Sequence, residues 1–247
     1  MTASGTGFFD QCFPSATVDL AVSFTAMHWL SRLPGPISTG VHSTQATGEE
    51  WAAFEAQSAK DFESILLARA AELKPGGRMV VANFAQDPNG HWLGKSDLGP
   101  CMYDTMDRCW RDMAEEGRIT MDEYRRTTFC NHYRTEREML APFAEGTRVH
   151  AAGLRLDAHS FVLTRCPYRE HYRANGGDAL KHARWMITTM RTWSNSTFES
   201  ALDTSRTEAE KRALSDELFD RMARVCAECP TEFGMDYVHA FLVVSKA

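Results

Sequence analysis

The sequence lacks the features of a membrane or secreted protein. No apolar run approaches the roughly 18 to 20 residues that cross a bilayer. The first residues, MTASGTGFFDQ, lack the basic flank and the apolar core of a signal peptide. We therefore expect no membrane partner and a cytoplasmic location.

An excess of positive charge is also missing. The chain carries 27 Lys and Arg residues against 33 Asp and Glu residues, and the net charge is -6. The two signs are interspersed along the chain. Because nucleic-acid binding needs a basic surface, we expect no nucleic-acid partner.

The cysteine pattern and the glycine pattern exclude two further classes. The seven cysteines are odd in number and irregularly spaced, which is typical of reduced thiols. Cys226 and Cys229 form a C-x-x-C motif, but no second pair of close Cys or His residues accompanies it, so we expect no metal site. No G-x-G-x-x-G follows a predicted strand, which argues against an NAD-dependent enzyme.

What is present is an α/β pattern. Residues 17–25, TVDLAVSFT, form an apolar run that predicts a buried strand. Residues 49–73 have helical spacing and predict one long amphipathic helix, which Lys74-Pro75-Gly76-Gly77 ends. Residues 78–84, RMVVANF, predict a second strand. A strand, a crossover helix and a strand form a βαβ unit, which implies a mostly parallel sheet with helices on both faces.

The rest of the chain continues this alternation. The apolar spacing predicts helices over 99–116, 136–143, 179–202 and 207–226, and strands over 148–156 and 237–245. Four strands are few for a doubly wound sheet.

Three segments carry a resemblance to a known family. Residues 23–34, SFTAMHWLSRLP, run from the first strand into a histidine and a tryptophan. Residues 6–14 read TGFFDQCFP, and residues 73–79 read LKPGGRM. Together they are similar to motifs of the SABATH methyltransferases, which include salicylate, benzoate, jasmonate and caffeine-pathway enzymes and their microbial relatives. The likeness spans nearly the whole chain.

The resemblance implies a fold and a methyl donor. It implies an α/β, Rossmann-like, partial class I methyltransferase over residues 1–247, dependent on S-adenosylmethionine (SAM). An α-helical cap over the acceptor pocket would come from about 99–145 and 177–226. Family members bind SAM through a glycine-rich loop in an N-terminal segment, and Gly5 and Gly7 follow no predicted strand. We therefore expect an N-terminally truncated domain.

The resemblance also implies site residues around the opening motif. Trp29 corresponds to the tryptophan that hydrogen-bonds the substrate carboxylate, and His28 occupies the neighbouring contact position. Thr25 stands where many relatives have tyrosine. Gly7 and Phe8 fall where a serine and a phenylalanine line the adenine of SAM. The alternative for Trp29 and His28 is ordinary core packing.

Four further residues fall at acceptor-pocket positions of the family: Met102, Tyr103, Met190 and Trp193. Methionine and aromatic walls suit a planar or apolar acid. Met102, Met190 and Trp193 also lie on apolar helix stripes, where core packing is the alternative. We assign no catalytic residue, because a carboxylate is already nucleophilic at pH 7 and needs only alignment and a dry pocket.

Two functions are consistent with these residues. The first is SAM-dependent methyl transfer to a small-molecule carboxylate or a heterocyclic nitrogen, with the acceptor oriented by Trp29 and His28. The alternative is a non-catalytic truncated homologue that binds small acids or a partner chain. The resemblance adds a homodimer as an expected assembly. Residues 17–25 would be an unpaired edge strand, which predicts self-association.

Overall fold

The apolar segment after Thr17 forms the first strand of a sheet in the computed structural model, which describes residues 3–247. Strand β1 (Val18–Phe24) leads through the short 3-10 helix η1 (Ser43–Gln45) into α1 (Gly48–Glu72) and then β2 (Leu73–Gln86). β1 and β2 are parallel neighbours, so the predicted βαβ unit is confirmed. The sheet order is β1-β2-β5-β4, with β4 (Leu154–Thr164), β5 (Tyr237–Lys246) and the short β3 (Arg134–Thr135) beside β2.

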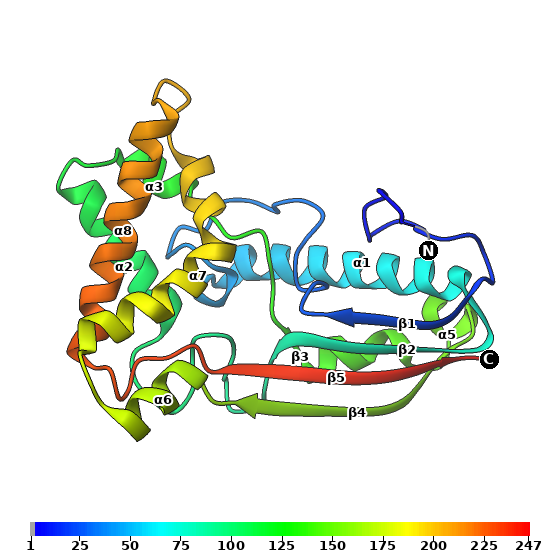
Figure 1. Cartoon of the computed structure of the whole chain (residues 1–247). Helices are drawn as coiled ribbons and strands as arrows, with labels where there is room; N and C mark the ends of the chain where they lie inside the picture. The colour runs from blue at the N-terminus through cyan, green and yellow to red at the C-terminus, as the bar shows by residue number, and fades with distance from the viewer. Residues whose placement is uncertain (1–2) are drawn as a thin grey trace.

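The strands differ in direction. β1 and β2 are parallel, whereas β5 is antiparallel to both β2 and β4. Figure 1 shows that β4 ends, and β5 begins, at the end of the sheet where the helical cluster lies. Because the chain leaves β4 and returns to β5 at that same end, the two strands must run in opposite directions.

One face of the sheet carries the main core. Alternate residues of β2, including Met79, Val81 and Ala85, pack with α1 residues such as Phe62 and Ile65. The short helices α4 (Glu136–Leu140), η2 (Ala141–Phe143) and α5 (Arg148–Ala151) contribute to this same cluster. On the opposite face of the described chain, several large apolar side chains remain exposed: Leu20, Val22, Phe24, Val162 and Phe241.

A helical cap sits at the end of the sheet where β1, β2 and β4 finish (Figure 1). It consists of α2 (Met102–Glu115), α3 (Met121–Arg126), α6 (Pro167–Asn175), α7 (Ala179–Ala201) and α8 (Glu208–Glu228). Its core is rich in methionine and aromatic side chains, among them Met106, Trp110, Phe198 and Met222. Residues 136–143, which the sequence had assigned to the cap region, pack against the sheet instead.

Two sequence-based predictions were wrong in their boundaries. Residues 148–151 form a helical turn, because the Thr147 side chain accepts the His150 N–H, and the strand begins only at Leu154. The segment Lys74–Gly77 lies inside β2 rather than before it. A side-chain carbon at Gly77 would lie 2.9 Å from the Lys74 carbonyl oxygen, so this stretch of the strand needs glycine.

Among residues 3–247, no helix combines the length and the apolar character that crossing a bilayer requires.

Candidate functional site

A cavity of about 380 Å³ lies where the sheet meets the helical cap. Its walls are mostly aromatic and aliphatic, and none of its lining residues is Lys, Arg, Asp or Glu. The lining residues are Thr25, His28, Trp29, Phe84, Leu93, Asn131, Tyr133, Pro167, Tyr168, Thr189, Trp193, Met235 and Tyr237. Such a pocket suits a small ligand with an apolar body.

Two antiparallel segments build one wall of this cavity. Trp29 and Asn131 form an isolated antiparallel bridge. The Leu30 N–H donates to the Cys130 carbonyl at 2.9 Å, and the His132 N–H donates to the His28 carbonyl at 2.9 Å. The motif after β1 is therefore held in register against residues 130–132.

Thr25 forms the turn between β1 and this wall. Its φ is 50°, a left-handed conformation that β-branched residues rarely adopt. Its N–H donates to the Ala82 carbonyl at 2.7 Å, which keeps the turn attached to β2. Backbone strain of this kind is often found at functional sites.

His28 is a neutral residue in the cavity wall. It is only 4% exposed, and burial lowers its pKa to about 3, although hydrogen bonding from Asn83 acts in the opposite direction. Its ring packs edge-on against Phe84 at a centroid distance of 5.1 Å. At neutral pH His28 therefore offers a polar contact without adding charge.

Two of the three tyrosines that line the cavity, Tyr133 and Tyr168, have their hydroxyls bonded to other hydroxyls. Tyr133 and Tyr103 share a hydrogen bond of 2.6 Å, and Tyr168 and Thr189 share one of 2.5 Å. Burial raises the pKa of Tyr133 and of Tyr103, so both stay protonated.

A buried arginine donates hydrogen bonds to the backbone that carries the same wall. Arg134, on β3, donates to the Met27 carbonyl at 2.5 Å and to the Ser58 carbonyl at 2.8 Å. Its guanidinium lies 4.6 Å from the centroid of the Phe62 ring. Burial lowers the pKa of Arg134 to about 10, so it remains charged at neutral pH. This contact fixes the backbone directly before His28.

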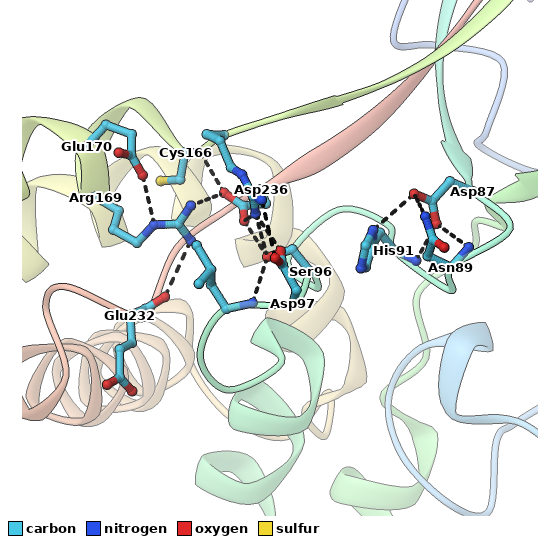
Figure 2. Close-up of polar contacts among 12 residues, drawn as sticks. Asp87, Asn89, His91, Ser96, Asp97, Cys166, Arg169, Glu170, Glu232 and Asp236 are labelled. Carbon is cyan, nitrogen blue, oxygen red and sulfur yellow. Dashed lines mark hydrogen bonds and ion pairs between the residues drawn. The ribbon is translucent and has the colours of Figure 1, made fainter.

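A second polar cluster, centred on Asp236, stabilises another part of the cavity wall. Figure 2 shows Asp236 between Arg169, Ser96 and the backbone of Cys166. The Arg169 guanidinium donates to the Asp236 carboxylate at 2.6 Å, and the Cys166 N–H donates to it at 2.7 Å. Burial acts to raise the pKa of Asp236, but these hydrogen bonds outweigh it and the pKa is lowered.

This cluster lies next to cavity residues in the chain. Asp236 is flanked by Met235 and Tyr237, and Cys166 precedes Pro167. In the same region, Asp87 accepts the Asn89 and His91 backbone N–H groups, each at 2.9 Å (Figure 2). The two polar groups thus anchor the loop after β2 and the start of β5.

The structure brings together some of the residues expected from the sequence. Thr25, His28, Trp29 and Trp193 all line the cavity. Met102, Tyr103 and Met190 are fully buried in the core of the cap and do not line it. Tyr103 touches the cavity only through the hydroxyl of Tyr133.

Gly7 and Phe8, expected near SAM, do not line this cavity. Phe8 stacks on Phe9 at 4.3 Å and borders a separate hollow of about 440 Å³ along the free edge of β1. Glu72 is the one carboxylate that lines this hollow. It is already paired with Arg69 at 2.6 Å and accepts the Phe13 N–H at 3.1 Å. The hollow therefore offers an aromatic surface for adenine but no free carboxylate for a ribose.

Sequence reasoning missed nine of the thirteen residues that line the cavity. Phe84 and Tyr237 are at strand ends that face the cap, a position where α/β proteins place ligands, and could have been proposed on that ground. Asn131 and Tyr133 lie in a segment without regular periodicity. Only their pairing with residues 28–30 reveals them.

Comparison with known proteins gives one family. The family model for SAM dependent carboxyl methyltransferases matches residues 1–247. Gibberellic acid methyltransferase 2 of Arabidopsis thaliana is 33% identical over 135 residues, which cover 49% of this chain and 34% of that protein. O-methyltransferase acrG of Aspergillus aculeatus is 29% identical over 198 residues, covering 75% and 50%. The chain thus spans between about a third and a half of the length of these relatives.

One solved structure has a similar fold. It is described as loganic acid methyltransferase with SAH, and it superimposes with a TM-score of 0.67 at 18% identity. The match covers 98% of this chain and 65% of that one. At this identity the likeness is evidence for the fold only.

Proposed function

The chain belongs to the SAM-dependent carboxyl methyltransferase family, and we propose that it binds a small apolar acid whose carboxylate receives the methyl group of SAM. The supporting observation is the cavity between the sheet and the cap. It combines aromatic walls with an indole at Trp29 and has no charged side chain. An apolar ring system is stabilised by such walls, while its carboxylate depends on a few neutral donors.

The acceptor needs no general base. Carboxylic acids with ordinary pKa values near 4 are ionised at pH 7, so the attacking oxygen is already an anionic nucleophile. In the transfer, that oxygen forms a bond to the methyl carbon as the carbon–sulfur bond breaks, and no proton has to be removed. The chain's contribution is orientation and exclusion of water.

Trp29 and His28 orient the acceptor in this proposal. The indole of Trp29 offers one N–H and no acceptor, so it can hold one carboxylate oxygen. His28 is neutral and adds a polar contact beside it. A heterocyclic nitrogen would fit the same apolar walls, but the description of the family favours the carboxylate.

SAM supplies an electrophilic methyl group to the reaction. Of its contacts, only an aromatic surface at Phe8 is evident in the hollow beside β1. The alternative, a homologue that binds acids without methylating them, is supported by the same observation.

Product formation separates the two functions. We would incubate the protein with methyl-labelled SAM and indole-3-acetate and measure the labelled methyl ester. The proposal expects ester formation, with kcat/KM about tenfold lower in Trp29→Phe, the loss typical of one hydrogen bond to a charged group. Acid binding without ester formation would favour the alternative. If the acid is neither bound nor methylated, both functions are contradicted for this acid.

A further inference from the structure

Asn131 is the polar residue of the cavity wall to which neither the sequence nor the comparisons give a role. It is 1% exposed and lines the cavity. Its Oδ1 is buried and has no hydrogen-bond partner of strict geometry among the described residues. A buried amide is costly unless its atoms are paired, so its surroundings should reveal its orientation.

The neighbouring His42 has a defined tautomer. It is fully buried, and the Thr44 backbone N–H donates to its Nδ1 at 3.1 Å. A backbone N–H can only donate, so Nδ1 must carry a lone pair. Burial keeps the pKa of His42 well below its usual value, so the ring is neutral. A neutral imidazole that accepts at Nδ1 carries its proton on Nε2.

That proton faces the Asn131 amide. The Ser43 hydroxyl, next to His42 in the chain, donates to the Asn131 carbonyl at 3.1 Å, so the two residues adjoin. His42 Nε2 is buried without another partner among the described residues; burial lowers the pKa of His42, and a contact with the Asn131 side chain opposes this. The contact does not meet strict hydrogen-bond geometry, but the two buried atoms have no other partner in residues 3–247. Because an N–H needs an oxygen, Oδ1 must face His42. The amide nitrogen is then turned away from His42.

The amide nitrogen has two N–H groups to place. Nδ2 is not among the buried side-chain atoms that lack a partner, and Asn131 lines the cavity, so an amide N–H is free to face the cavity. Trp29 is the bridge partner of Asn131, and directly opposed residues point to the same side with side chains in contact range.

We propose that Asn131 is an acceptor-binding residue that donates an amide N–H to the substrate carboxylate beside the indole of Trp29, and that His42 is the positioning residue that holds the amide in this orientation. The inference rests on the proposed function. It identifies the ligand class as a monoanionic carboxylate bound by two neutral donors, with no cationic side chain in the cavity.

The tautomer of His42 is tested without any ligand. Two-bond nitrogen–proton correlation NMR on the purified protein at pH 7 distinguishes the two neutral tautomers and the imidazolium. The inference expects a proton on Nε2 and an unprotonated Nδ1. A proton on Nδ1, or on both nitrogens, would overturn it.

The role of Asn131 is tested by calorimetric titration with indole-3-acetate and, as a neutral isostere, indole-3-acetamide. Asn131→Leu should weaken binding of the acid about tenfold and binding of the amide much less. His42→Phe, which keeps a ring against Tyr103, should weaken acid binding by a smaller factor. Thr128→Val removes another buried, unpartnered oxygen outside the cavity and should change neither affinity.

The outcomes separate this inference from the proposed function. If the wild type binds the acid and Asn131→Leu binds it equally well, the inference is overturned while the proposed function stands. Unchanged acid binding in His42→Phe overturns the positioning role. If the wild type binds no acid, the proposed function fails for this ligand, and the His42 tautomer alone then supports or overturns the orientation of Asn131.

Discussion

The histidine of the cavity wall, His28, and the nearby His42 are neutral because they are buried. His28 and His42 are both nearly inaccessible to water, and burial lowers the pKa of each. Sites for a carboxylate often hold a cation, but the buried Arg134 donates to two backbone carbonyls and does not line the cavity. The carboxylate would therefore be held by neutral donors.

This burial predicts a loss of stability in acid. For both histidines the folded pKa lies below the unfolded value of 6.5, so the unfolded state binds more protons as the pH falls below 6.5. Protonation of each histidine in the unfolded state should lower the free energy of unfolding by about 1.4 kcal/mol as the pH falls from 7.5 to 5.5. Urea unfolding at the two pH values measures this. His28→Gln should remove about 1.4 kcal/mol of this loss, and an unchanged pH dependence in that variant would contradict the pKa assignment.

Thr25 carries strain that a glycine would relieve. At φ 50° glycine has no steric penalty, whereas threonine costs on the order of 1 to 3 kcal/mol. Thr25→Gly should raise the free energy of unfolding by about 1 kcal/mol after its greater unfolded-state entropy is counted. Thr25→Val, which keeps the β-branch, is the control and should bring no gain. A destabilised glycine variant would show that the turn is not strained.

At the scale of elements, the long helices and the first two strands could be predicted from the sequence. α1, α7 and α8 have clear apolar spacing and end near Pro, Gly or capping residues, so their bounds differ from the predicted ones by a few residues. The strand predicted over 148–156 differs in position from β4. β4 is an edge strand, and polar residues such as Asp157 and Ser160 weaken its apolar pattern. The short α3 was missed, although Thr120 and Glu123 form a capping box that marks its start.

The candidate site was predictable only where it follows a strand. Trp29 and His28 come directly after β1 and were identified from their motif. Asn131 reaches the cavity through backbone pairing between segments about 100 residues apart, which no local pattern encodes. Met102 and Met190 are apolar like the cavity residues, but they pack in the cap core. The sequence could not separate the two places, because an apolar stripe on a helix does not reveal which neighbour it faces.

The Asp236 cluster joins β5 to α6 and should be a main source of stability at this wall. Asp236→Asn would leave Arg169, which is 1% exposed, with only the exposed Glu170 as a counter-charge, and should cost about 3 kcal/mol or more. Asp97→Asn removes the exposed partner of Arg165 and should cost much less, because solvent screens an exposed ion pair. Denaturant unfolding of both variants measures the difference. Equal losses of unfolding free energy would show that the buried pair contributes no more to stability than the exposed one.

At the scale of the whole molecule, β1 is an edge strand with apolar residues on one exposed face. Leu20, Val22 and Phe24 are each more than half exposed. Unpaired strand edges and apolar patches favour pairing with another chain. The 247-residue chain should therefore self-associate, and sedimentation velocity over a concentration series should show species larger than the monomer. Val22→Lys should shift the distribution toward monomer, whereas a wild type that stays monomeric throughout would refute the expectation.

The central claim is that the cavity between sheet and cap binds a small carboxylate through neutral donors. Calorimetric titration of indole-3-acetate into the wild-type chain and into Trp29→Phe tests it most directly. The account predicts saturable binding to the wild type and about tenfold weaker binding to the variant, since the variant keeps an aromatic wall but loses one N–H to a charged group. Equal affinity for both proteins would contradict the claim that Trp29 holds the carboxylate in this cavity.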